Sequence, residues 1–90
     1  MQLVWKPMAQ EDREHIFVWL SAQNIQAAIE LDDDFDLFAE RICVEPLIYR
    51  PGRIEGSREA VVRPNYIMLY KVEGADIHIV RILHTSQQWP

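Results

Sequence analysis

The chain has 90 residues, of which 49% are hydrophobic and 26% are charged, and its formal net charge is −5. This length supports one domain with one small core, so we expect a single domain over residues 1–90, and the apolar content excludes a disordered chain. No apolar run approaches the roughly 20 residues that span a bilayer, and the N-terminus lacks a signal-peptide pattern. Cys43 is the only cysteine, which excludes an internal disulfide and, with no export signal, indicates a reducing cytoplasm.

The first half predicts a strand followed by two helices. Leu3–Trp5 is short and apolar, and Pro7 suits the first turn of a helix. Helical spacing then relates Met8, Asp12, His15, Ile16, Trp19 and Leu20. Asn24 is a good N-cap for a second helix, which Pro46 ends. The apolar stripe of that helix is Ala28, Leu31, Phe35, Phe38 and Ile42.

The second half predicts three strands. Residues 49–59, "YRPGRIEGSRE", are rich in glycine and proline and indicate a loop. The runs "REAVV", "YIMLYKV" and "IHIVRIL" follow, separated by the turn-forming "RPN" and "EGAD". We therefore expect an α+β, two-layer fold in the order β-α-α-β-β-β, with a helical hairpin packed on one face of an antiparallel sheet.

Charge is unevenly distributed along the chain. Residues 30–45, which include "DDDFD", carry a net charge of −6, whereas residues 46–90 carry +2. The aspartates fall between the apolar stripe positions, so we expect a solvated helix face, with an acidic surface for a basic partner as the alternative. Five of the six cations after residue 45 are arginines, which suit bidentate contact with phosphate or carboxylate.

Few residues form a pattern that carries chemistry. "PGRIEG" lacks the spacing and the lysine of a phosphate-binding loop, and the three histidines have no ligand spacing, so we expect no metal and no cofactor. Strict alternation in the last strand would place Arg81 and His84 on opposite faces, and either residue on an uncovered face would make a binding surface. The alternative for Arg81 is an ion pair with a carboxylate such as Glu59.

Residues 52–90 resemble the RelE/ParE superfamily of bacterial type II toxins. The shared features are the "GR…G.RE" entry into a strand, the "Y..LY.V.G" hairpin and the terminal "I.R.LH…QWP". In the first half, "W...A..D...I..WL" and "N..AA" match the paired helices of the family, so the resemblance covers essentially the whole chain. It implies a β-α-α-β-β-β fold and a toxin that a cognate antitoxin neutralises.

The resemblance leaves two toxin mechanisms open. Some members are ribosome-dependent messenger-RNA endonucleases, which need cations to hold the phosphate and an acid/base pair to move protons. ParE-type members poison DNA gyrase and need no catalytic residues. The basic positions of the nucleases fall on Glu59, Val61, Ile67 and near Ser86 here, which favours the gyrase poison. If the chain is a nuclease, the residues left for catalysis are Arg58, Arg81 and His84.

The resemblance also implies a target-binding surface and partners. The expected target-binding residues are Arg53, Arg58, Arg63, Arg81, His84 and Gln88. The expected partners are gyrase, or alternatively the ribosome, and a DNA-binding antitoxin whose disordered tail lies across the helical hairpin and the sheet; no membrane is involved. A third hypothesis is a non-toxic module that only binds an antitoxin. We expect Trp89 to close the core, with an exposed anchor as the alternative.

Overall fold

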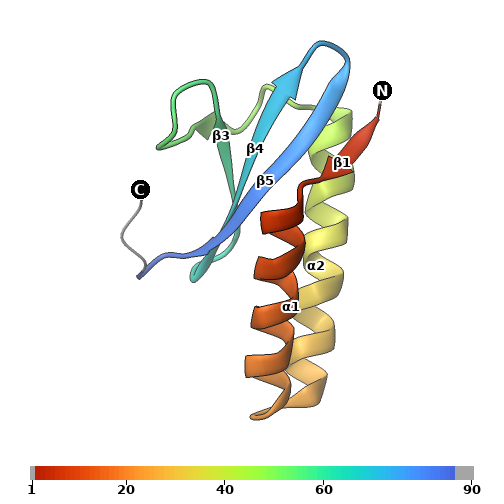
Figure 1. The fold of residues 1–90 in the computed structure, drawn as a ribbon, viewed down its shortest axis with the longest axis vertical. Helices are drawn as coiled ribbons and strands as arrows, with labels where there is room; N and C mark the ends of the chain where they lie inside the picture. Colours follow the sequence, from red (N-terminus) through yellow and green to blue (C-terminus); the bar gives the residue numbers. More distant parts are fainter. Residues whose placement is uncertain (1, 87–90) are drawn as a thin grey trace.

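The computed structural model describes residues 2–86 and consists of two helices packed on a five-stranded sheet (Figure 1). The elements in chain order are β1 (Leu3–Trp5), α1 (Pro7–Ser21), α2 (Ile25–Val44), β2 (Arg50–Pro51), β3 (Arg58–Arg63), β4 (Tyr66–Glu73) and β5 (Asp76–His84). The predicted strand, helical hairpin and three-stranded meander are all confirmed. The two-residue β2 is an addition, because it lies in the segment that the sequence predicted to be a loop.

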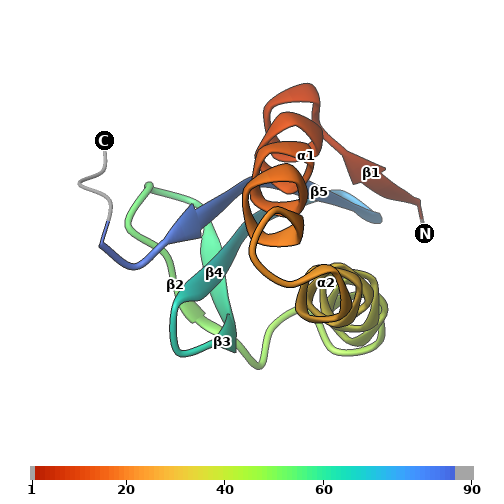
Figure 2. The ribbon, with the colours of Figure 1, turned by 90° about the horizontal axis from the view of Figure 1, so that it is seen from below.

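The sheet is mixed, and this corrects the expected antiparallel sheet. Its strand order is β1-β5-β4-β3-β2, and β1 pairs with β5 in parallel while the other pairs are antiparallel. The parallel pair arises because the helical hairpin returns the chain to the sheet far from β1, and the meander then brings β5 alongside β1. Figure 2 shows both helices on one side of the sheet, with α1 over β5.

The helix boundaries follow from the predicted signals. Pro7 occupies the first turn of α1, and the side chain of Asn24 caps α2 by accepting a hydrogen bond of 3.0 Å from the backbone N–H of Ala27. Helix α2 ends at Val44, before Pro46, as expected. At the β4–β5 turn, Gly74 has a φ of +61°, a conformation that glycine adopts without a steric penalty.

The main core lies between the helices and the sheet. Helix α2 contributes the buried residues Ala28, Leu31, Phe35, Ala39 and Ile42. Ala39 therefore takes the stripe position predicted for Phe38, which is only partly buried because its ring lies at the edge of the core under the guanidinium of Arg41. Cys43 also packs against this core, and burial raises the pKa of its thiol.

The opposite face of the sheet has a smaller apolar cluster. Ile67, Leu69 and Leu83 are buried there, and Ile54 from the β2–β3 connection packs against them. The middle of this face is therefore covered, so it is not the open binding surface that the sequence left possible. No helix among residues 2–86 is both long enough and apolar enough to cross a membrane.

An irregularity in β5 changes which residues share a face. The pairing register between β4 and β5 shifts at Leu69/Tyr70, so that Leu69 lies opposite Arg81 and Tyr70 lies opposite Ile79. Val80 has no pairing partner of its own on β4, and the alternation reverses beyond it. Ile82 consequently faces the helices with Ile79, whereas Leu83 joins the cluster on the opposite face. The strict alternation predicted for this strand is therefore wrong beyond Val80.

Candidate functional site

Arg81 is fastened to helix α1 by an ion pair with Asp12. Its Nε and Nη2 donate to the two carboxylate oxygens at 2.7 and 3.0 Å, and the backbone N–H of Ile82 donates to the same carboxylate at 2.9 Å. Both side chains are only 15% exposed. The hydrogen bond from Asp12 raises the pKa of Arg81. The partner of Arg81 is thus Asp12 and not Glu59, which corrects the prediction.

His84 lies on the helix-facing side, at the end of β5. Its Nδ1 lies 2.6 Å from the hydroxyl of Ser86 and accepts the backbone N–H of that residue at 3.1 Å. In the neutral ring the proton is therefore on Nε2. The ring stands edge-on to Tyr66 with centroids 5.2 Å apart.

A cleft surrounds this histidine, and we call it the His84 cleft. It has a volume of about 300 Å³ and is lined by His15, Ile16, Trp19, Tyr66, His84 and Ser86. The side chain of Trp19 is 60% exposed. Aromatic and histidine side chains around an apolar hollow can hold an apolar or aromatic anchor of a partner.

Arg63 reaches α2 from the far end of β3. Its Nε donates to the carboxylate of Asp34 at 2.8 Å, and its Nη2 lies 2.7 Å from the same oxygen. A second hollow of about 410 Å³ adjoins the His84 cleft here, and Arg63, Asn65, Trp19 and His84 are among its lining residues. Arg63 therefore lies near His84 but is engaged by a carboxylate. In the "DDDFD" segment Asp33 and Asp36 are exposed, as the solvated helix face predicted, and Asp32, Asp34 and Asp36 also form ion pairs.

Arg58 is bound to the segment that follows α2. Its Nη1 donates to the backbone carbonyls of Leu47 and Tyr49 at 3.2 and 2.8 Å. Arg58 lies opposite Tyr70, whereas His84 lies opposite Tyr66, so the two are separated by about 13 Å along β4. The structure thus does not bring Arg58 together with His84.

Arg53 lies on the opposite face of the sheet, where it binds Glu59. The carboxylate of Glu59 is 5% exposed and accepts hydrogen bonds from the side chains of Arg50 and Arg53 and from the backbone N–H of Arg53. Burial by itself would raise the pKa of Glu59, but the bonds from Arg53 and Arg50 outweigh burial and lower it. This carboxylate holds the β2–β3 connection to the sheet.

The predicted site residues therefore divide into separate places. Arg58, Arg63 and His84 are paired with helix-facing residues of β4, with Arg58 at the other end of that strand from His84. Arg81 is paired with Leu69 of the opposite face, although its guanidinium reaches Asp12 of α1, and Arg53 is also on the opposite face. Gln88 and Trp89 lie outside the described residues. Within residues 2–86, no group of three or more histidine, cysteine or acidic side chains could hold a metal ion.

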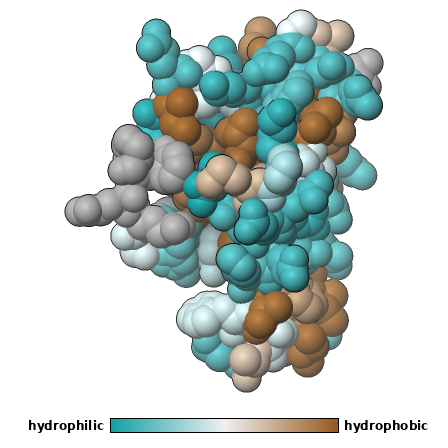
Figure 3. All heavy atoms as spheres, in the orientation of Figure 1, coloured by the Kyte–Doolittle hydropathy of each residue, from teal (hydrophilic) through white to brown (hydrophobic). Residues whose placement is uncertain are grey.

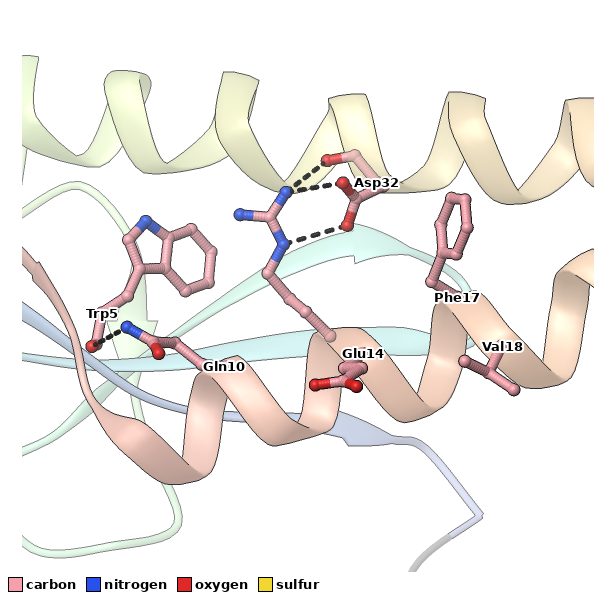
Figure 4. Close-up of a pocket in the computed structure, with 7 residues that line it drawn as sticks. Trp5, Gln10, Glu14, Phe17, Val18 and Asp32 are labelled. Atoms are coloured by element: carbon pink, nitrogen blue, oxygen red, sulfur yellow. Dashed lines mark hydrogen bonds and ion pairs between the residues drawn. The ribbon is translucent and has the colours of Figure 1, made fainter.

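Sequence analysis did not identify the groove between the two helices (Figure 4). It has a volume of about 530 Å³, and Arg13 crosses it between the ring of Trp5 and the carboxylate of Asp32. The guanidinium lies 4.6 Å from the Trp5 ring centroid and also binds Asp36 at 2.9 Å. Burial lowers the pKa of Arg13, but the two aspartates outweigh burial and raise it. The spacing of Asp32 and Asp36, one helical turn apart, was the sequence signal for a shared cationic partner.

The arrangement of a helical hairpin on a five-stranded mixed sheet is shared with known toxins. The chain is similar to the "Chromosomal ParDE TA system from P. aeruginosa", with a TM-score of 0.82, 20% identity and coverage of 93% of this chain and 95% of that one. It is also similar to the "YoeB/ParE toxin from Agrobacterium tumefaciens", with a TM-score of 0.70, 14% identity and coverage of 93% and 98%. These likenesses define the class as the RelE/ParE fold.

The sequence comparisons establish the family within this class. The family model for the "ParE toxin of type II toxin-antitoxin system, parDE" matches residues 3–89. The chain therefore belongs to the ParE toxin family. It is also 28% identical over 87 residues to the protein named "Putative toxin Y4kP" of Sinorhizobium fredii, with coverage of 96% of this chain and 90% of that protein.

Proposed function

We propose that this toxin arrests growth by poisoning DNA gyrase in the cytoplasm, without a catalytic step, and that a cognate antitoxin neutralises it. Membership of the ParE family supports the toxin and antitoxin parts of the proposal. The target-binding surface in this proposal is the His84 cleft, with Arg63 and Arg81 beside it.

One observation carries the choice of a non-catalytic mechanism. Each arginine that a nuclease would use is already engaged by the protein itself: Arg81 by Asp12, Arg63 by Asp34, and Arg58 by two backbone carbonyls. A scissile phosphate needs cations that are free to stabilise its developing charge. Of the three, Arg63 lines a hollow together with His84, and Asp34 already binds it.

Recruiting Arg81 to a phosphate would require its separation from Asp12. The pair is largely buried, and breaking such a pair by removing one partner costs about 3–5 kcal/mol. The phosphate would also approach the carboxylate of Asp12, which repels it. The net charge of −5 further weakens attraction to the ribosome, where long-range positive potential assists binding.

The second candidate is the RelE-like messenger-RNA endonuclease. The position of His84 in a cleft beside Arg63 favours it, because a histidine can move a proton near neutral pH. In that mechanism Arg58 and Arg81 would hold the phosphate and His84 would act as acid or base. The separation of Arg58 from His84 along β4 weighs against this assignment.

A paired experiment separates the two mechanisms. Gyrase supercoiling is measured with purified toxin, and messenger cleavage is mapped by primer extension after induction. We expect gyrase inhibition without codon-phased cleavage. We also expect His84→Gln, which keeps hydrogen-bonding capacity, to remain toxic. Cleavage that disappears in His84→Gln, with gyrase unaffected, would assign the nuclease mechanism instead.

Toxicity itself is tested by induction in a bacterial host. We expect growth arrest that a co-expressed antitoxin, encoded beside this chain, relieves. Arrest is scored by colony counts, with soluble expression checked on gels. Normal counts despite soluble expression would instead support the non-toxic interaction module.

A further inference from the structure

A group of aliphatic side chains is exposed where α2 ends. Leu37, Val44, Leu47 and Ile48 are 42%, 78%, 66% and 63% exposed, and we call these four residues the α2-end patch. They lie within twelve consecutive positions, and Leu37 and Val44 are two helical turns apart on one face of α2. Aliphatic side chains gathered in this way indicate a binding surface rather than scattered surface residues.

The loop that carries half of this patch is held rigidly. The hydroxyl of Tyr70 donates to the carbonyl of Pro46, and Arg58 donates to the carbonyls of Leu47 and Tyr49. The ring of Tyr49 packs edge-on against Tyr70, with centroids 6.2 Å apart. Three carbonyls within four residues are thus bound from the sheet side, while the side chains of Leu47 and Ile48 point to solvent. A braced apolar surface loses little conformational entropy when a partner binds.

The patch borders a groove with an acidic rim. The groove has a volume of about 350 Å³ and is lined by Leu37, Glu40, Arg41, Val44, Glu45, Ile48 and Tyr49. The guanidinium of Arg41 lies 5.1 Å from the ring centroid of Phe38, which directs it along the helix surface. Its charged lining residues are the carboxylates Glu40 and Glu45 and the guanidinium of Arg41, so carboxylates outnumber cations at the groove. A partner that carries arginine or lysine beside aliphatic anchors complements both features.

We infer that the α2-end patch anchors the toxin-binding tail of the cognate antitoxin, through a short segment with aliphatic side chains flanked by arginine or lysine. This inference rests on the toxin–antitoxin pairing and not on the identity of the target. A second copy of this chain fits less well, because a symmetric contact would place two acidic segments against each other. The patch also lies at the opposite end of the hairpin from the α1–α2 turn, and so away from the His84 cleft (Figure 1).

The surface of the molecule is consistent with separate contact regions. In Figure 3, brown apolar areas are divided by a broad hydrophilic band across the middle of the face shown. The groove beside the α2-end patch and the His84 cleft share no lining residue, so substitutions in the patch can weaken antitoxin binding without altering the cleft. This separation makes the inference testable.

The test measures antitoxin affinity and toxicity on the same variants. The antitoxin encoded by the adjacent reading frame is purified, and its affinity for the toxin is measured by calorimetry. Val44→Asp and Ile48→Asp remove exposed aliphatic surface, and Val72→Asp is the matched control because Val72 is a 37% exposed aliphatic residue on β4, outside the patch. We expect about a tenfold or larger loss of affinity for the patch variants, as for central interface residues, and less than about twofold for the control. Glu45→Lys should also weaken binding, and the difference from the unmodified chain should shrink in high salt.

The outcomes are distinct. Patch variants that stay folded by circular dichroism, remain toxic alone and escape antitoxin rescue would support the inference. Unchanged antitoxin affinity would overturn it. Lost toxicity with intact antitoxin binding would also overturn it and would assign the patch to the target. A concentration-dependent dimer that Ile48→Asp abolishes, with unchanged antitoxin affinity, would assign it to self-association. Because affinity is measured without gyrase, failure of the proposed target leaves this test interpretable.

Discussion

Replacing Asp12 tests how firmly β5 is fastened to α1. Asp12→Ala removes one carboxylate and with it the acceptor of three hydrogen bonds, two from Arg81 and one from the backbone N–H of Ile82. Removing one partner of a buried ion pair costs about 3–5 kcal/mol, and the 15% exposure of both side chains places the expected loss near the lower end, at about 3 kcal/mol. A domain of this size has a total stability of roughly 5–13 kcal/mol, so the loss is large.

Urea unfolding followed by tryptophan fluorescence measures this loss. Glu11→Ala is the matched control, because Glu11 is the exposed neighbour of Asp12 on α1, and we expect a change within about 0.5 kcal/mol. Asp12→Asn keeps an acceptor for the Ile82 N–H but loses the charge, so its stability should lie between those of the other two. The double variant Asp12→Leu/Arg81→Met should recover much of the loss, since apolar residues can replace a buried pair.

The result that would refute this reasoning is specific. If Asp12→Ala lowers stability by less than about 1 kcal/mol with an unchanged urea slope, the ion pair does not fasten β5 to α1. Arg81 would then be available to a phosphate at little cost. The argument against a nuclease would lose its main energetic support.

Three further predictions concern the core and the titrating groups. Phe35→Ala should lower the free energy of unfolding in urea by about 3–5 kcal/mol because Phe35 is buried. Phe38→Ala should cost less because Phe38 is only partly buried. Asp33→Ala should change stability by under about 0.5 kcal/mol because Asp33 is exposed. Folding lowers the pKa of Glu59, so the stabilisation that its carboxylate provides is present above the unfolded pKa of roughly 4.3 and is lost as pH falls further. In Glu59→Gln, the free energy of unfolding should therefore fall less steeply at acid pH. Burial raises the pKa of Tyr70 to about 12, so its contribution to stability should be lost as pH rises from about 10 toward that value. An absorbance titration should show a late component that Tyr70→Phe removes.

The sequence by itself determined the first strand, the two helices, the three-stranded meander and their order, but not the two-residue β2. Pro7, Asn24 and Pro46 fix helix boundaries through local backbone chemistry, and helical spacing identified Phe35 as a core residue. The motifs that resemble RelE/ParE toxins also lie in the sequence, and the match to residues 3–89 confirms the family. Helix boundaries and helical spacing depend on neighbouring residues, and the family resemblance depends on the order of short motifs. Both can therefore be predicted from the sequence alone.

Only the tertiary structure decided which charged residues meet. The partner of Arg81 is 69 positions away in the chain, and the partner of Arg63 is 29 positions away, so no sequence spacing reveals either pair. The register shift near Val80 also came from the tertiary structure. One extra residue in a strand moves every later side chain to the opposite face of the sheet. Arg58, a predicted site residue, braces the segment after α2, because the fold brings that segment's carbonyls to β3. Which arginines remain available to a target was therefore set by long-range packing and not by their identity in the sequence.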